Sequence, residues 1–439
     1  MARNRVIYQS EALYTSKNIA SQASGEHFQL RRVQSANYNF SIDRKDVNQF
    51  GQLARIDALV LKSPTVGLDF SYYPTDGLNE KALGFYVRDA GIPIYRTGNN
   101  SPYTGPVATG LPDETTTPKT NVFSGYQSVP PEGNFASGQM GASSGQNFYI
   151  VTTDEGQDLN TTVGASAANP GAMSGKNIIA IGNGFLSNYT LDASVGNLPT
   201  VKITIEGLNM QSSTILGTAI TGTQNGNNLT GTGNMVIVPS VDPTNGSSKY
   251  LTGGLKNPSE TTGAGILSAL RPGDLTLSFG DYETATSTEG SPIASLTSLN
   301  VQSASLSLPL SRTPIERLGS RFAYARVVDF PIVATLNVSS ILSDVQARNL
   351  SSMLDDSTKR DVTLTIKKPG STDVALAYSL KGTLLKSESF SSSIGSNKTV
   401  DLVFETQIGG PSDTKNGVYV SGSYTYADWT SNVSGTWAY

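Results

Sequence analysis

A strand, a short loop and a second strand are encoded twice in this chain of 439 residues. Residues 186–206, LSNYTLDASVGNLPTVKITIE, align without gaps with residues 385–405, LKSESFSSSIGSNKTVDLVFE. In both copies the apolar residues of the second strand alternate with polar ones, which is the period of a strand buried on one face. Gly196 and Gly395 interrupt the pattern at the same place. Each copy therefore predicts a β-hairpin.

An earlier segment is also repeated. Residues 33–36, Val-Gln-Ser-Ala, return at residues 301–304, and the same spacing places Gly51 level with Gly319. Alternating apolar and polar residues follow both tetrapeptides, beginning at Tyr38 in the first copy, and a second alternating run comes after a proline in each case. This pattern predicts a pair of half-buried strands in each half of the chain.

The spacing between the repeats indicates where the two halves differ in length. Residues 148–152 resemble residues 362–366, and the distance between matching blocks shrinks along the chain. The extra residues of the first half fall in stretches rich in Gly, Pro, Ser and Thr, which are typical of loops. We therefore interpret the chain as two homologous β-rich units, residues 1–211 and 270–439, the first with a long inserted loop at about residues 91–145.

Some segments do not follow the strand pattern. Residues 212–269 are rich in Thr, Gly and Asn and form either a linker or a small appended element. Residues 339–359 carry apolar side chains at helical spacing, with Ser339 or Ser340 suited to the N-cap, and residues 75–83 are a weaker counterpart. The predicted fold is mainly β, with two barrel or sandwich units in tandem and a helix flanking each.

Composition excludes several classes of function. Charged residues make up 15% of the chain, against about 25% in an average soluble domain, and 31 basic and 35 acidic residues give a net charge of −4. A chain without a strongly basic stretch is poorly suited to wrapping nucleic acid. There is no Cys, and His27 is the only His, so thiol catalysis, a His-based triad and a zinc site are disfavoured. We expect no enzymatic activity, no cofactor and no bound metal.

Three segments resemble the structural proteins of tailed bacteriophage virions, above all the major tail tube protein of long-tailed phages. They are YNFSIDRKDVNQFG, PTVGLDFSYYPTDG and YTLDASVGNLPTVKITIEGLN, at residues 38–51, 64–77 and 189–209. The resemblance lies in the strand pattern and covers both halves. It implies a β-barrel or sandwich with a flanking helix, assembled with itself and other virion proteins into stacked rings through which DNA passes without specific binding. Some tail proteins of this kind carry two copies per chain and close a ring with three chains, so the resemblance implies a homotrimer with apparent sixfold symmetry.

Subunit contacts are expected at the hairpin tips, at the inserted loop and in the aromatic C-terminal segment, because aromatic residues are favoured in interface cores. The two tryptophans pack either at such an interface or on their own unit. The residues singled out are Asn197, Asn397, Trp429, Trp437 and Tyr439.

The lumen of a tube that passes DNA is expected to repel phosphate, which suits a mildly acidic chain. The candidates are the acids that lie on repeated strands or their loops, although each also suits an ordinary solvent-facing position. They are Asp43, Asp46, Asp69, Asp192, Glu206 and Glu405.

Two alternatives remain open on the sequence. One is another phage structural protein, such as a neck, capsid decoration or fibre protein. The other is a host-binding module that presents the loop at residues 91–145 and the Tyr-rich C-terminal segment. In each case we expect assembly in the bacterial cytoplasm without membrane insertion, because there is neither an apolar run long enough to span a bilayer nor a secretory signal. The location expected from the resemblance is the virion tail.

Overall fold

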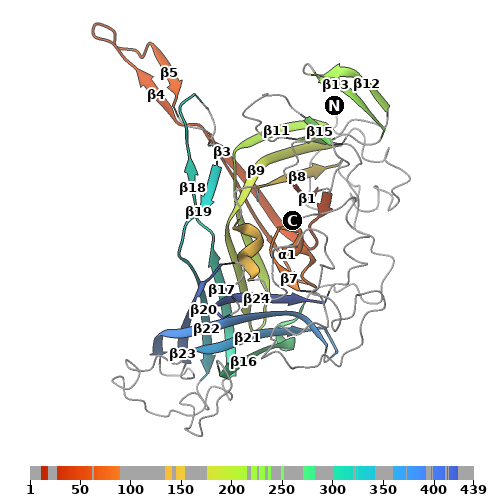
Figure 1. Cartoon of the computed structure of the whole chain (residues 1–439), viewed down its shortest axis with the longest axis vertical. Helices are drawn as coiled ribbons and strands as arrows, with labels where there is room; N and C mark the ends of the chain where they lie inside the picture. The colour runs from red at the N-terminus through yellow and green to blue at the C-terminus, as the bar shows by residue number, and fades with distance from the viewer. Residues whose placement is uncertain are drawn as a thin grey trace.

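The chain folds into large antiparallel sheets with very little helix (Figure 1), as the alternating sequence pattern predicts. This is a computed structural model. It describes residues 11–17, 27–61, 64–88, 134–140, 145–153, 176–214, 219–224, 227–232, 236–238, 249–251, 270–281, 300–319, 323, 325–341, 359–371, 373–391, 397, 399–410, 413 and 415–423.

The largest feature is an eight-stranded antiparallel sheet, named here the long sheet. Both predicted hairpins belong to it: one is formed by its strands β9 and β10, and the other by its strands β22 and β23. Its strands, in spatial order, are β3 (Val33–Ser41), β6 (Thr65–Tyr72), β10 (Thr200–Gly207), β9 (Asn177–Ser194), β17 (Asn300–Pro309), β20 (Ile332–Ile341), β23 (Thr399–Ile408) and β22 (Val374–Ser391). The sheet is open at β3 and β22, so within the described residues these strands do not close into a barrel.

Two outer sheets extend from the long sheet through the shared strands β9 and β22. Each shared strand is long enough to pair in the long sheet with one part and in an outer sheet with the other. The first outer sheet contains β2 (His27–Gln29), β1 (Glu11–Lys17), β8 (Gln146–Thr152), β9 and β11 (Asn209–Thr214). The second contains β16 (Leu275–Asp281), β21 (Arg360–Lys367), β22, β24 (Gly417–Gly422) and β7 (Val87–Arg88), the last in parallel.

The long sheet consists of two groups of four strands with the same order and the same register. In the hairpin of the first group Thr200 lies opposite Asp192, and in that of the second group Thr399 lies opposite Ser391. The pairing of β3 with β6 is irregular just after Val33, and the pairing of β17 with β20 is irregular just after Val301. The groups meet edge to edge where β9 pairs with β17.

One core lies between the long sheet and the outer sheets. Along β10, Val201, Ile203 and Ile205 are buried while the residues between them are not, and along β20 the same alternation runs from Ile332 to Ser340. A single cluster of buried side chains includes residues from all three sheets. The period-2 pattern of the sequence therefore buries one face of the long sheet and leaves the other face polar.

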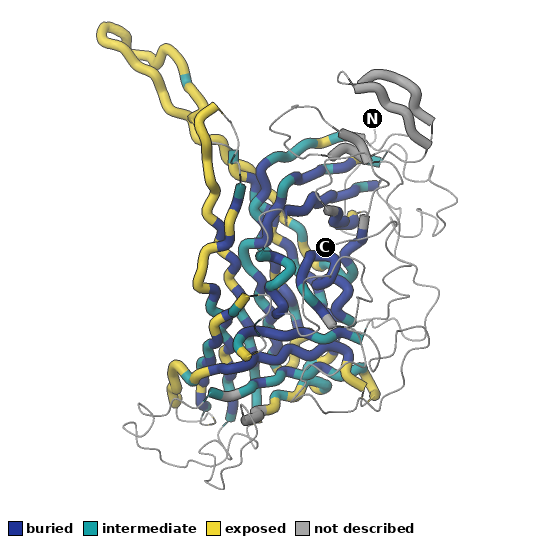
Figure 2. The backbone as a smooth tube through the Cα atoms, in the orientation of Figure 1, coloured by how far each residue is buried: buried dark blue, intermediate teal, exposed yellow. Residues whose placement is uncertain are grey.

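Two β-hairpins, named here the arms, extend the long sheet at one end (Figure 1). The first arm is β4 (Arg44–Val47) with β5 (Asp57–Val60), and the second is β18 (Arg312–Ile315) with β19 (Ala325–Val328). Figure 2 shows the first arm exposed along its length. Near the arm tips Gly51 and Gly319 both adopt positive φ, 86° and 82°, a conformation that favours glycine.

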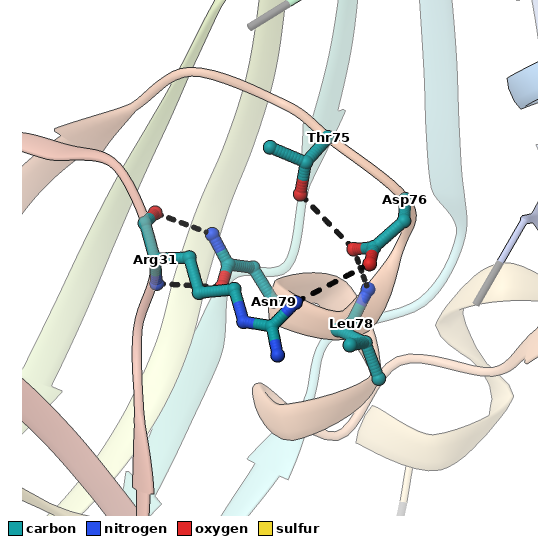
Figure 3. Close-up of polar contacts among 5 residues, drawn as sticks. All are labelled: Arg31, Thr75, Asp76, Leu78 and Asn79. Carbon is teal, nitrogen blue, oxygen red and sulfur yellow. Dashed lines mark hydrogen bonds and ion pairs between the residues drawn. The ribbon is translucent and has the colours of Figure 1, made fainter. Parts of the chain in front are cut away.

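The helical elements are short. α1 (Leu78–Ala82) lies within the predicted segment 75–83, and Asn79 ties it to the start of β3 (Figure 3): its amide Nδ2 donates to the Arg31 carbonyl at 2.8 Å, and its Oδ1 accepts from the Arg31 N–H at 2.9 Å. Asp76 accepts the first N–H of the helix, from Leu78. The remaining elements are η2 (Phe135–Gln139) and η4 (Pro272–Asp274).

The helix predicted for residues 339–359 is wrong at its start. Residues 339–341 belong to β20, because their backbone pairs with β17 on one side and with β23 on the other. Pairing with a strand on each side favours the extended conformation, even where the apolar residues are spaced as in a helix. Residues 342–358 lie outside the described part of the chain.

Both the segment expected to be an inserted loop and the segment expected to be a linker or small appended element contain described structure. Phe135 and Ala136 fall within the segment expected to be an inserted loop, but in η2 both are fully buried. The segment 212–269 contains two small hairpins. They are β12 (Ala219–Gln224) with β13 (Asn227–Thr232), and β14 (Val236–Val238) with β15 (Lys249–Leu251).

Candidate assembly interface

The long sheet presents two unpaired edges. Within the described residues β3 pairs only with β6, and the C-terminal part of β22, from Leu384 onward, pairs only with β23. Such an edge exposes a row of backbone N–H and C=O groups that can pair with another chain. Each edge also carries large apolar side chains in the open, Tyr38 and Phe40 on β3 and Phe390 on β22. Exposed apolar groups beside open backbone are typical of an interaction edge.

The arms carry a second set of exposed apolar side chains. Phe50 is 108% exposed, and Leu53 on the same tip and Leu318 on the second arm are equally open. An ion pair 2.9 Å long links Asp46 on β4 to Arg55, which lies just before β5. An apolar tip on a projecting hairpin is unusual for a free monomer and suits contact with another protein surface.

Four of the six predicted lumen acids lie on one surface, the polar face of the long sheet. Each of these acids lies between two buried residues of its strand, so all four project away from the core: Asp69 on β6, Asp192 on β9, Glu206 on β10 and Glu405 on β23. Asp401 joins them on β23. Asp401 was not among the predicted acids, although it also lies on a repeated strand.

Cations neutralise part of this polar face. Lys202 pairs with Asp192 at 2.8 Å, and Lys386 pairs with Glu405. Partial burial by itself raises the pKa of Asp192, but hydrogen bonds from Lys202 and Ser305 outweigh it and leave that pKa below its ordinary value. The face therefore carries both charges, with Asp69 and Asp401 at exposed positions.

Glu206 has a partner from an arm. Arg326 on β19 is buried and donates through Nη1 to Glu206 at 2.8 Å. The ion pair joins an arm of the second group to a strand of the first group, so it holds the base of this arm against the long sheet.

The other predicted residues lie elsewhere. Asp43 and Asp46 are exposed on the first arm and its base, away from the four acids on the sheet. Asn197 lies at the exposed β9–β10 turn, where Gly196 has φ 83°, and Asn397 is exposed just before β23. Trp429, Trp437 and Tyr439 lie outside the described residues.

A buried polar cluster joins the two groups of strands behind the polar face. The Tyr72 hydroxyl donates to Glu80 Oε1 at 2.9 Å, and Tyr189 donates to the same oxygen at 3.4 Å. The hydroxyls of Tyr189 and Tyr378 are 2.6 Å apart. Burial raises the pKa of Glu80 to about 7, an effect that hydrogen bonds from its backbone and from Tyr72 reduce. No sequence motif pointed to this cluster.

Among the helices of the described residues, none is long and apolar enough to cross a membrane. The same part of the chain contains no group of His, Asp and Glu side chains placed to hold a metal ion.

Comparisons with known proteins show a likeness in structure and none in sequence. No protein-family model matches the sequence, and no curated protein matches it. The chain is similar to the tube-terminating cap of an anti-feeding prophage, solved by cryo-electron microscopy, with a TM-score of 0.26 and 9% sequence identity. The match covers 38% of this chain and 99% of the cap chain.

Proposed function

We propose that this chain is a structural subunit of a phage tail tube, assembling edge to edge into rings that stack. The observation that carries the proposal is the joint between β9 and β17. There the outer edge of one four-strand group pairs with the outer edge of a second group of the same order. No described strand pairs with the equivalent edges at the two ends of the sheet. A joint of this kind repeats from chain to chain, which is how heterologous contacts generate rings.

The proposal includes an internal duplication, with units at residues 1–211 and 270–439. The common strand order of the two groups supports it, as does the common register. Further support comes from the outer sheets, in which β8 meets β9 with the same irregularity that β21 shows where it meets β22. The arms, each inserted between the first two strands of its group, add a fourth correspondence.

Geometry favours a ring wide enough for DNA. Eight strands per chain in three chains make about 24 strands, which at about 4.8 Å spacing and about 40° tilt close into a wall about 48 Å across. Barrels of roughly 16 to 18 strands already leave an aqueous channel. The core lies on the other face of the long sheet, so the polar face with Asp69 and Asp401 lines the lumen, where exposed carboxylates disfavour lasting contact with phosphates.

Electron microscopy of the purified protein tests the proposal. We expect rings or hollow tubes with threefold true and sixfold apparent symmetry in negative stain. Finite trimers that do not stack would favour a neck, decoration or fibre protein. Monodisperse monomers at high protein concentration would overturn the proposal.

The arm tips give a sharper prediction about stacking. In the Phe50→Ser/Leu53→Ser variant, tube formation falls about tenfold or more, because loss of a buried interface anchor costs more than about 1 to 2 kcal/mol. The thermal stability of the dilute monomer stays the same, because both side chains are fully exposed in it. Pelleting and negative stain measure assembly, and circular dichroism measures unfolding.

The matched control for the arm is Gln49→Ser/Gln52→Ser. These glutamines are exposed on the same tip and contact each other at 3.0 Å, so their loss changes the tip without removing apolar surface. Tubes that form normally from the Phe50→Ser/Leu53→Ser variant would show that the arm does not contribute to stacking.

A further inference from the structure

We infer that the C-terminal part of β22 pairs with β3 of the next copy of this chain, antiparallel and in the register of the β9–β17 joint. In this register Phe390 of one chain lies opposite Tyr38 of the next. The inference rests on the proposed function, and it adds the strand that each edge takes as its partner and the residues that meet.

The joint within the chain supplies the template. At its centre Leu191 of β9 lies opposite Leu306 of β17, and one residue along Asp192 lies opposite Ser305. The Ser305 hydroxyl donates to Asp192 Oδ1 at 2.6 Å across the joint. The template thus has an apolar side facing the core and a polar side facing away from it.

The strand registers within each group show which residues of the open edges correspond to the residues of this template. Asp192 faces Thr200 in one hairpin and Ser391 faces Thr399 in the other, so Ser391 holds the place of Asp192. On the other edge, Asn37 of β3 is paired with Asp69 of β6. In the second group Ser305 of β17 is paired with Asn337 of β20 in the same way. Asn37 therefore occupies the position in the first group that Ser305 occupies in the second. The pair Asp192 and Ser305 of the in-chain joint therefore becomes Ser391 and Asn37 between chains.

Burial supports the transfer independently of register. In the in-chain joint Leu191 is 0% and Leu306 is 1% exposed. Their counterparts on the open edges, Phe390 and Tyr38, are 51% and 43% exposed in the single chain. Large apolar side chains are thus about half-exposed at the two positions that the template buries, and a joint between copies would cover the rest of their surface.

The two joints differ at the next apolar position. Leu308 lies opposite Tyr189 within the chain, and the template places Phe40 opposite Glu388 between chains. A carboxylate there makes the joint between chains less apolar than the joint within the chain.

Backbone hydrogen bonds of the template show which positions suit a cross-link. Val195 N donates to Gln302 O at 2.9 Å. Antiparallel pairs alternate between bonded and non-bonded, so this bond makes the pair Asp192 and Ser305 a non-hydrogen-bonded one, with Cα atoms about 4.5 Å apart. That separation is within the range of a disulfide.

Cysteine cross-linking tests the register in the full chain, which has no Cys of its own. We expect Asn37→Cys/Ser391→Cys and Asn39→Cys/Ser389→Cys to form disulfides between chains on mild oxidation, seen as dimers and trimers in non-reducing gels and reversed by reductant. The slipped combination Asn39→Cys/Ser391→Cys should react about tenfold more slowly, because diagonal neighbours lie about 7–8 Å apart. All four positions are exposed in the single chain, so the substitutions leave its core intact.

The arrangement rules out a bond within one chain, because β3 and β22 lie at opposite ends of the eight-stranded sheet. Mixing an Asn37→Cys chain with a Ser391→Cys chain gives the same test with one substitution in each partner. Preferential reaction of the slipped pair in rings would overturn the register and leave the proposed function standing. Rings without any of these disulfides would place the ring joint elsewhere, and the absence of both rings and disulfides would overturn the inference together with the proposed function.

Discussion

The Phe135→Ala variant loses about 3–5 kcal/mol of unfolding free energy, the range for truncating a fully buried Phe. Phe135 lies in η2 with no exposed surface. Its ring stacks on Phe85 with 4.1 Å between centroids and meets the edge of Tyr189 at 5.2 Å. The same ring reaches Tyr378 of β22, so Phe135 packs at the point where strands of both groups come together.

Urea unfolding of the dilute monomer measures this effect. Phe50→Ala is the matched control, because it removes the same ring from a fully exposed position and is expected to change the unfolding free energy by no more than about 0.5 kcal/mol. A loss below about 1 kcal/mol for Phe135→Ala would mean that η2 does not pack into the core in solution.

Stability of the monomer falls by about 3 kcal/mol through Glu80 as pH rises from about 4.5 to about 7. Burial raises the pKa of Glu80 from 4.5 to about 7 in the folded chain, so between these values the folded state binds more protons than the unfolded state. Below about pH 4.5 both states are protonated and the contribution is fully present. Above about pH 7 both are ionised and the loss is complete.

The Glu80→Gln variant isolates this contribution. A neutral amide keeps an oxygen to accept from Tyr72, so the difference in unfolding free energy between the original chain and the variant should change across pH 4.5–7 by about 3 kcal/mol. Urea unfolding at several pH values measures it. A difference that stays constant with pH would mean that the carboxyl of Glu80 is solvated in the folded state.

The hairpins were predictable because a gap-free repeat and a period-2 pattern agree in both halves. The short helix η2 was not predictable, because Gly, Pro and Ser dominate the composition around Phe135. Only the tertiary fold brings Phe135 against Phe85. The helix predicted from the spacing of apolar residues at 339–359 is wrong at its start for a related reason. Neighbouring strands on both sides of β20 are not visible in a single sequence.

The candidate interface was predictable only in part. Period-2 alternation placed Asp69 and Glu405 on one face, but it could not separate them from Asp43 at the base of an arm. The same alternation placed Tyr38 on the buried face of its strand, whereas its side chain is 43% exposed at an edge of the sheet. A strand that a second chain would cover has the same sequence pattern as a strand covered by its own chain.

The joint between β9 and β17 also has a kinetic consequence. In the proposed ring every second edge joint is of this kind and forms when the chain folds, so it carries no cost in translational entropy and does not respond to dilution. Three joints between chains then complete a circle of six units. Closing and opening of the ring are governed by the other joint, the one with Glu388 opposite Phe40, while stacking depends on the arms. The double unit can therefore enter and leave a ring without separating its two halves.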